Sequence, residues 1–568
     1  MTREQHVQQL SKPEPDSFRR RYLPASRSGW LLLGLVFLLL WFGTLQYRSL
    51  FDTDEGRYAE IPREMLVTGN WLTPHLNGVI YLEKPPLQYW ATAAAFTLFG
   101  QHNWTARLWT ALTGFAGLLV VWGTGRRLFG KRAGLLSALI LASSFLYLGL
   151  GHINTLDMGV TFFMTLALCG FLLAQDRPEQ VGRRRGWMLL AWAAMAGAFL
   201  SKGLIGLLLP GGVLVLYTLW QRDWRLWSRL HLVTGLALFL LLALPWLVLE
   251  ARAVPGFLKF FFITQQFARY LTKVANRYQP WWWFVPILVL GIVPWLIPML
   301  EVVATRWRAA AARGQFDPQR FLWLWAVFIF AFFSFSDSKL AQYILPILPA
   351  LALLMGDAIS RNEGRGLRWT VALSLALGIL GVYGALHVSH MHTKLISAEM
   401  FSRFSHWLLA AALLAVAGSL ASAALWRRRA LAATVAGLAL TWSVGFQLVM
   451  NGAEVVAPTY STRSLVQQIR PQLAPGEPFY VVGRYDQTLP FYLKRTVTLV
   501  AYKGELAFGI ERDASNWLPS KAAFRKRWRR DSRAMAMMRE YTYRRFRKEG
   551  LPMQVAGRDP RWIVVKKP

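Results

Sequence analysis

The chain has 568 residues, of which 54% are hydrophobic, with 27 Trp, a mean hydropathy of +0.30 and a formal net charge of +34. A soluble globular protein with this much apolar surface would aggregate, so the composition excludes that class and predicts a membrane protein. The single Cys169 lies inside a predicted span, so disulfides do not contribute to the fold.

The first apolar run extends from Trp30 to Tyr47, close to the roughly 20 residues that cross a bilayer, and four arginines lie between residues 19 and 27. A secretory signal would need small residues at a cleavage site, but Arg48, Phe51 and Asp52 follow instead. We therefore interpret this run as a span that stays in the membrane.

Twelve more apolar runs follow, which gives thirteen predicted spans. They lie at about 104–125, 133–150, 158–174, 187–201, 203–220, 230–249, 281–304, 321–335, 340–356, 369–386, 405–425 and 430–449. Alternate loops between them hold 21 Lys and Arg, so by the positive-inside rule these loops and the N-terminus are cytoplasmic. An odd number of spans then places everything after Met450 on the other side.

We predict a mostly α-helical membrane domain over residues 1–450, with an external loop and interfacial helices at 51–103 and a long external loop at 251–280. The apolar stretch 87–100 is only fourteen residues long. Counting it as a span would reverse the charge pattern of the loops, so we expect an interfacial or re-entrant helix there.

Residues 451–568 change character and predict a small soluble α/β domain. The stretches "PFYVVG", "TVTLVA" and "RWIVVKK" indicate short strands with helical patterns between them. The domain holds 23 Lys and Arg against 10 Asp and Glu, and its densest run extends from Lys521 to Arg533. This run is either a solvated helix face or a surface for anionic lipid head groups; we expect no nucleic acid partner.

Charged residues that do not fit the cytoplasmic pattern gather at the external ends of the spans. Charge beside hydrocarbon is costly, so these residues form a candidate functional site. They are Asp52, Asp54, Glu55, Arg57, Glu83 and Lys84 in the first external loop, Asp157, Lys202 and Lys339 at later span ends, and Arg269 in the loop 251–280. Structural roles compete: helix capping for the aspartates, snorkelling for the two later lysines and an ordinary loop position for Arg269.

The stretch "YLEKPPLQYW" is harder to explain structurally. Pro85 and Pro86 fix an extended backbone, so Glu83 and Lys84 are held in place rather than left on a mobile tip. A rigid lysine at the mouth of a membrane protein suits a phosphate. The external "HVSHMH" has spacing that could bind zinc, but no carboxylate or Cys neighbours it locally.

No P-loop, Rossmann fingerprint or Gly-x-Ser-x-Gly elbow accompanies the external charges. The energy for a reaction on this side must therefore enter with an activated substrate.

The chain carries "DEGRYAEIPREMLVTGNWLTPHLNGVIYLEKPPLQYW" at residues 54–90, "LSKG" at 200–203 and "SKLAQYILPILP" at 338–349. These motifs closely resemble those of the lipid A aminoarabinose transferases of Gram-negative bacteria, which are GT-C membrane glycosyltransferases. The resemblance implies a donor of 4-amino-4-deoxy-L-arabinose on undecaprenyl phosphate, a lipid A phosphate as acceptor, and a site on the periplasmic face of the inner membrane. It also implies polymyxin resistance through a lower negative surface charge.

The resemblance also implies roles for individual residues. It assigns Asp54 to the catalytic centre, Lys84 and Arg269 to the donor phosphate, and Tyr58, Tyr81 and Tyr343 to the pocket, with Glu83, Asp157, Lys202 and Lys339 as further pocket residues. The external loop reads "FFITQQFARY", with no His beside Arg269, so we infer no His-based metal site. We expect no cofactor, membrane lipids as neighbours, and a monomer.

Two other functions would also gather charge at one membrane face. A polyprenyl-phosphate mannosyltransferase would need Asp54 as a general base for a Ser or Thr hydroxyl of a protein. A lipid-linked sugar flippase would also gather charge at one membrane face, but such transporters often contain internal repeats, and we find no repeat of the 54–90 block.

Overall fold

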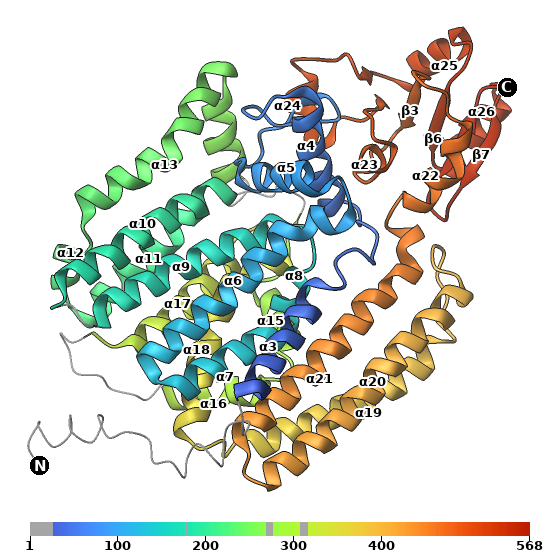
Figure 1. Cartoon of the computed structure of the whole chain (residues 1–568). Helices are drawn as coiled ribbons and strands as arrows, with labels where there is room; N and C mark the ends of the chain where they lie inside the picture. The colour runs from blue at the N-terminus through green and yellow to red at the C-terminus, as the bar shows by residue number, and fades with distance from the viewer. Residues whose placement is uncertain (1–26, 177–178, 269–276, 307–315) are drawn as a thin grey trace, which may run out of the picture.

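A computed structural model describes residues 27–176, 179–268, 277–306 and 316–568. Long helices lie side by side in a bundle, and the strands of the C-terminal segment gather at one end of it (Figure 1). The first external loop, with α4 and α5, lies at the same end of the bundle.

Seven helices among the described residues are long and apolar enough to cross a membrane, so the chain is a polytopic membrane protein. They are α6 (Asn103–Phe129), α9 (Leu156–Asp176), α13 (Leu232–Ala253), η4 with α18 (Ala341–Ile347 and Leu348–Arg361), α19 (Leu367–Val388), α20 (Ala398–Arg427) and α21 with η5 (Leu431–Gly452 and Ala453–Thr459). The apolar windows of α9 and α18 are 83% and 89% buried, whereas those of α13 and α19 are 22% buried. The first two therefore form the centre of the bundle, and the last two lie at its periphery.

Further helices lie in the remaining predicted runs and in the loops beside them, and one of them, α10, has 22 residues like α13. They are α3 (Arg27–Phe42), α7 (Lys131–Ser143), α8 (Phe145–Leu150), α10 (Val181–Lys202), α11 (Ile205–Gln221), α12 (Arg225–Ser228), η1 (Lys259–Ala268), η3 (Trp281–Trp283), α15 (Phe284–Gly291), α16 (Leu296–Arg306) and α17 (Pro318–Ser334). The runs 133–150 and 281–304 are therefore each divided between helices, and Pro294 lies in the second break, where a backbone N–H is missing.

The first external loop folds into two helices and a hairpin. Helix α4 (Asp54–Thr68) lies in the segment 51–103, where helices are expected, and α5 (Leu87–Phe99) confirms the helix predicted at 87–100. The place of both helices in the membrane interface stays a prediction. Strands β1 (His75–Leu76) and β2 (Val79–Ile80) pair through Asn77 and Gly78. Both turn residues have positive φ, 56° and 80°, which this tight hairpin turn requires and which Asn-Gly provides.

The C-terminal segment forms a six-stranded sheet in the order β5-β4-β3-β6-β8-β7. The strands are β3 (Phe479–Val482), β4 (Thr498–Val500), β5 (Trp517–Leu518), β6 (Met535–Met538), β7 (Gln554–Arg558) and β8 (Ile563–Lys566). Strands β5, β4, β3 and β6 are parallel to one another, whereas β8 is antiparallel to both of its neighbours, β6 and β7. The helices are α22 (Arg463–Ile469), η6 (Arg470–Gln472), α23 (Leu489–Leu493), η7 (Gly504–Leu506), α24 (Ala507–Ile510), α25 (Lys521–Arg530) and α26 (Glu540–Lys548). The three predicted strands are confirmed as β3, β4 and β8.

The two faces of this sheet bury different partners. Val481 and Met537 pack in one cluster with Tyr58, Ile61 and other apolar residues of the first external loop. Tyr480, Val482 and Met538 face the other way, against Phe524 of α25 and Phe546 of α26, as alternation along a strand requires. The C-terminal domain is therefore docked on the first external loop by its own core.

Polar contacts fix the same docking. The Asn77 side chain donates from Nδ2 to the Val497 carbonyl and accepts from the Val497 N–H, both at 2.8 Å. Gly56 of α4 lies against the backbone of Gln487, where a Cβ at residue 56 would approach the Gln487 carbonyl carbon to 2.5 Å. Only glycine permits this close approach of α4 to the C-terminal domain.

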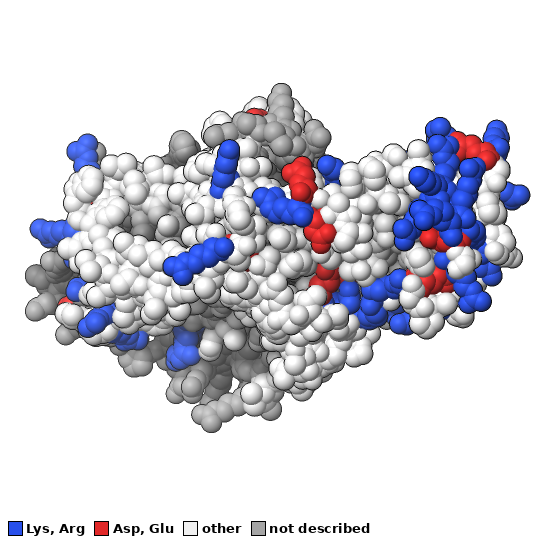
Figure 2. Space-filling view, turned by 90° about the horizontal axis from the view of Figure 1, so that it is seen from above, with Lys and Arg blue, Asp and Glu red and all other residues white. Residues whose placement is uncertain are grey.

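The outer surface of the C-terminal domain is strongly basic. Lys and Arg gather over this end of the molecule, whereas most of the rest of the same face is uncharged (Figure 2). In α25, Phe524 and Trp528 are buried while Lys526, Arg527, Arg529 and Arg530 are exposed. The basic run is thus one face of an amphipathic helix, and its contact with anionic lipid stays a prediction.

Candidate active site

A pocket opens where the first external loop meets the ends of α9, α10 and α17. Its lining comes from segments far apart in the sequence. The lining residues are Asp54, Arg57, Tyr58, Glu83, Lys84, Leu156, Asp157, Lys202, Ile205, Gln265, Gln266, Arg277, Phe333, Ser336, Ser338, Leu340, Gln342 and Tyr343. Three carboxylates and four cations among them make this a charged pocket on the membrane domain.

Seven of the ten predicted site residues line this pocket: Asp54, Tyr58, Glu83, Lys84, Asp157, Lys202 and Tyr343. Tyr81 lies behind the lining and donates from its hydroxyl to Glu83 Oε2 at 3.1 Å. Lys339 is buried, and its chain neighbours Ser338 and Leu340 line the pocket. Its Nζ donates to the Ser336 carbonyl. Arg269 lies outside the described residues.

Asp54 is the first residue of α4, and its carboxylate faces the pocket. The N-cap position belongs to Thr53, which makes no side-chain cap hydrogen bond, so the capping alternative for Asp54 is wrong. The Asp54 side chain is 32% exposed, and its Oδ1 lies 3.5 Å from Arg57 Nη1. This separation is long for a charge-assisted hydrogen bond, so the carboxylate is only loosely paired.

Asp157 and Lys202 form a close ion pair across the pocket. Lys202 Nζ also lies 4.7 Å from the centre of the Tyr343 ring, within reach of a cation–π contact. The pair joins the first turn of α9 to the last turn of α10, so Lys202 does not snorkel to an interface but contributes to the pocket.

Arg57 is a pocket residue that the sequence placed among the external charges but to which it assigned no role. Its side chain is 10% exposed, and its guanidinium carbon lies 5.9 Å from the ring centres of both Tyr58 and Tyr81. Nη2 contacts Glu505 Oε1 of the C-terminal domain at 3.2 Å. Burial raises the pKa of both phenols, so Tyr58 and Tyr81 stay protonated and can donate hydrogen bonds into the site.

The pocket also contains uncharged polar residues and one loop arginine that were not predicted from the sequence. Gln265 and Gln266 come from η1, Arg277 from the segment that follows it, and Ser336, Ser338 and Gln342 from the connection between α17 and α18. Arg277 is a cation of the loop 251–280, so its charge was the one available signal. The amides and hydroxyls carry no charge pattern from which a pocket could be predicted.

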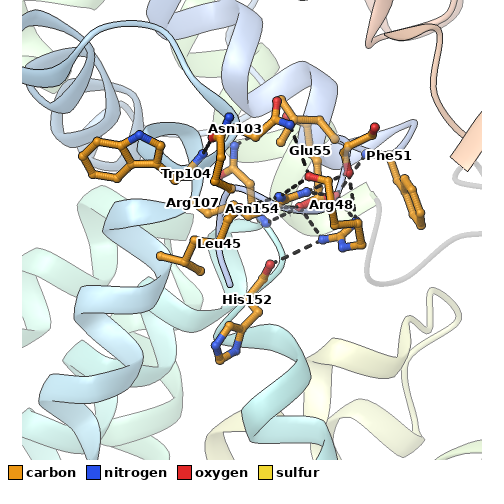
Figure 3. Close-up of polar contacts among 12 residues, drawn as sticks. Leu45, Arg48, Phe51, Glu55, Asn103, Trp104, Arg107, His152 and Asn154 are labelled. Atoms are coloured by element: carbon orange, nitrogen blue, oxygen red, sulfur yellow. Dashed lines mark hydrogen bonds and ion pairs between the residues drawn. The ribbon is translucent and has the colours of Figure 1, made fainter. Parts of the chain in front are cut away.

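A buried ion network holds the start of α4 in place (Figure 3). Glu55, 2% exposed, accepts from Arg48 at 2.7 and 2.9 Å, from Arg107 at 2.7 and 3.1 Å, and from the backbone N–H groups of Phe51 and Asn154 at 3.0 and 3.1 Å. Burial alone would raise the pKa of Glu55, but the two guanidiniums outweigh it and hold this pKa well below its usual range. The network fixes the residue next to Asp54.

Asp52 faces the C-terminal domain rather than the pocket. Its Oδ1 accepts from the Gln487 N–H at 2.9 Å, and the fully buried Asp486 lies nearby, paired with Arg561 at 2.9 Å. Burial, together with the charge of Asp486, raises the pKa of Asp52 to about 7. Asp52 therefore belongs to the docking surface and not to the predicted site.

Metal binding by the three histidines of "HVSHMH" gains no support. Across the described ranges, no three His, Cys, Asp or Glu residues come together as a group that could hold a metal ion.

Family models match two parts of the chain. Residues 465–567 match the aminoarabinose transferase C-terminal domain, and residues 28–261 match the family described as dolichyl-phosphate-mannose-protein mannosyltransferase. The matches therefore cover both the C-terminal sheet and the part of the membrane domain that carries α4, Lys84 and Lys202.

Three similar proteins are named undecaprenyl phosphate-alpha-4-amino-4-deoxy-L-arabinose arabinosyl transferase. A relative from Proteus mirabilis is 31% identical over 85% of this chain and 87% of its own length, and one from Pseudomonas aeruginosa is 32% identical over 85% and 87%. One from Edwardsiella ictaluri is 34% identical over 64% of this chain, and the match spans 65% of that relative, just under two thirds.

A solved structure has the same fold. The crystal structure of ArnT from Cupriavidus metallidurans bound to undecaprenyl phosphate is 36% identical, with a TM-score of 0.90 over 95% of this chain and 98% of that chain. The apo structure of the same protein matches with a TM-score of 0.88.

Proposed function

Because the chain belongs to the family of undecaprenyl phosphate-α-4-amino-4-deoxy-L-arabinose arabinosyl transferases, we propose that it moves this sugar from undecaprenyl phosphate to a phosphate of lipid A. The transfer replaces phosphate charge at the cell surface and gives resistance to polymyxin. The observation that carries the proposal is the convergence of Asp54, Lys84 and the Asp157–Lys202 pair in one pocket beside the docked C-terminal domain.

We propose that thirteen spans place this pocket on the periplasmic side of the bacterial inner membrane. The N-terminus is then cytoplasmic and residues 451–568 are periplasmic. Alkaline phosphatase fused after residue 568 should be active, and a fusion in the loop 177–185 should be inactive. The reverse pattern would contradict this orientation and the site that depends on it.

The donor phosphate needs cations at the pocket. Lys84 lines it, Arg57 lines it from α4, and Arg269 is the third candidate from the sequence. A charge-assisted bond to phosphate contributes about 1.5–3 kcal/mol, so two such cations can stabilise both the bound donor and the departing lipid phosphate. The extended backbone predicted at Pro86 is wrong, because Pro86 is the N-cap of α5 with φ −90° and ψ −5°. The two prolines still restrict the backbone that follows Lys84, which supports this role.

The acceptor enters as an anion. A phosphate monoester has a second pKa near about 6, so its oxygen needs little help from a base at neutral pH. That oxygen forms a bond to the anomeric carbon, the bond from this carbon to the donor phosphate oxygen breaks, and undecaprenyl phosphate leaves with the electron pair. The direct displacement inverts the anomeric configuration. Asp54 orients the acceptor or stabilises the positive charge that develops at the anomeric carbon.

Sugar transfer to lipid A in proteoliposomes, read by mass spectrometry, tests the proposal. Asp54→Asn keeps the size of the side chain but removes its charge, so folding and donor binding should persist while transfer falls by at least about a hundredfold. Glu179→Gln, an exposed carboxylate far from the pocket in the sequence, is the matched control. Parent-like transfer by Asp54→Asn would remove the catalytic role.

The same preparation separates the rival functions. A protein mannosyltransferase would glycosylate a Ser- or Thr-containing peptide, and a higher pH would partly rescue its Asp54→Asn variant, because a hydroxyl must lose a proton. A flippase would move labelled donor across the bilayer without forming a glycosylated product. Either result in the parent protein would overturn the proposed transferase.

A further inference from the structure

The C-terminal domain contacts the pocket residue Arg57 through the carboxylate of Glu505. Its Oε1 accepts from Arg57 Nη2 at 3.2 Å and from the side-chain amide of Gln487, and its Oε2 accepts from the Tyr502 hydroxyl at 2.9 Å. The Glu505 side chain is 19% exposed. Three donors from separate positions therefore hold this carboxylate in one orientation beside a pocket residue.

The segment that carries Glu505 is itself clamped to the membrane domain. The ring of Phe508 stacks on that of Phe260, with centres 4.0 Å apart, and Arg512 Nη2 donates to the Pro255 carbonyl at 3.1 Å. Gly509 lies so close to β2 that a Cβ there would approach the Ile80 carbonyl oxygen to 2.4 Å. Glu505 cannot drift away from Arg57 unless these contacts break.

Arg57 lies between two carboxylates that compete for it. Nη2 contacts Glu505 at 3.2 Å, and Nη1 lies 3.5 Å from Asp54. The buried Nε has no hydrogen-bond partner among the described residues, so the two Nη contacts and the neighbouring rings of Tyr58 and Tyr81 orient the guanidinium. Without the contact to Glu505, Arg57 would move toward Asp54. The two side chains would then form the shorter pair with two hydrogen bonds that is typical of arginine and carboxylate.

We propose that Glu505 is a positioning residue that holds Arg57 away from Asp54. The carboxylate of Asp54 then keeps its charge for the acceptor and the reacting sugar, and the guanidinium stays directed at the pocket. Without Glu505, Arg57 pairs closely with Asp54 and withdraws both groups from the reaction. This inference rests on the proposed transferase function, and it gives the C-terminal domain a role in the chemistry.

The test is the kinetics of full-length variants in proteoliposomes. Glu505→Gln should lower kcat by about tenfold, the scale of coupling between contacting residues, with KM for the donor changed by less than about twofold. Glu505→Asp should recover part of the loss, because it keeps a carboxylate near Arg57. Glu540→Gln, which breaks the exposed pair with Arg544 in the same domain, is the control and should match the parent.

A double-variant cycle with Arg57→Lys separates positioning from a general structural effect. A lysine keeps the charge but cannot contact two carboxylates through a planar fork, so adding Glu505→Gln to Arg57→Lys should change kcat by less than about twofold. An equal loss in both backgrounds, or parent-like kcat in Glu505→Gln, would overturn the inference. Failure of the parent itself to transfer the sugar would instead refute the proposed function.

Discussion

Glu55→Gln should destabilise the protein strongly, because Glu55 accepts six hydrogen bonds and is the shared counter-ion of Arg48 and Arg107. Glutamine keeps one acceptor oxygen, but its amide presents donors to two guanidiniums that are themselves donors. Both arginines are nearly inaccessible to water, with 6% and 1% of their side chains exposed. Removing one partner of a buried ion pair costs about 3–5 kcal/mol, and here two cations lose their partner together.

Thermal unfolding of the purified protein in detergent, followed by Trp fluorescence, measures the loss. The control is Glu540→Gln, whose exposed pair with Arg544 should contribute at most about 1 kcal/mol. The midpoint for Glu55→Gln should fall well below those of the parent and the control. A midpoint equal to that of the control would refute the reasoning, because the network would then be no more stabilising than a surface pair.

The same network predicts a pH dependence. The folded-state pKa of Glu55 is lowered, so its stabilisation is fully present above the ordinary carboxyl pKa of about 4.3 and is lost as pH falls toward the lower folded value. The parent should therefore lose stability on acidification more steeply than Glu55→Gln. Parallel stability curves for the two proteins below about pH 4 would contradict this assignment.

Three further outcomes follow from single contacts. Lys84→Met should weaken binding of the donor about tenfold to a hundredfold, measured by titration with undecaprenyl phosphate, and unchanged affinity would leave Lys84 as an anchor. The pKa of Asp52 is raised to about 7, so its contribution to stability is fully present below the unfolded pKa and is lost as pH rises through about 7. Asp52→Asn should therefore make the unfolding midpoint depend less on pH up to about pH 7. The same pH dependence in parent and variant would refute the raised pKa. Gly56→Ala should drive a Cβ into Gln487 and lower the unfolding midpoint, whereas Gly123→Ala, with nothing within 4 Å, should not; equal midpoints would show that α4 tolerates the side chain.

The charged part of the site was predictable from the sequence because charge at a membrane face is too costly to be incidental. Asp54, Lys84, Asp157 and Lys202 all follow from that single argument and all line the pocket. Arg57 was listed among the external charges but was given no role, because nothing in the local sequence shows its contact with Glu505.

Other features depended on tertiary context that no local pattern carries. Glu505 lies 448 residues from Arg57 in the sequence. From the sequence alone it is one of several acidic residues in a basic domain, with no feature that links it to the pocket. Strand β6, with the sequence Met-Ala-Met-Met, was missed because these residues do not favour strands, but it is buried on both sides of the sheet. Gln265 and Gln266 come from a π-helical segment, a form that apolar periodicity does not predict.

The docking of the C-terminal domain on the first external loop has a consequence for biogenesis. Asn77 and Val497 pair across 420 residues of sequence, so the ribosome completes one partner long after it has synthesised the other. A nascent chain that has inserted its helices still lacks Glu505 beside Arg57. With the proposed topology and the proposed role of Glu505, catalytic competence is delayed until the last part of the polypeptide has been translocated and folded, and a prematurely terminated chain would occupy the membrane without consuming the lipid-linked sugar.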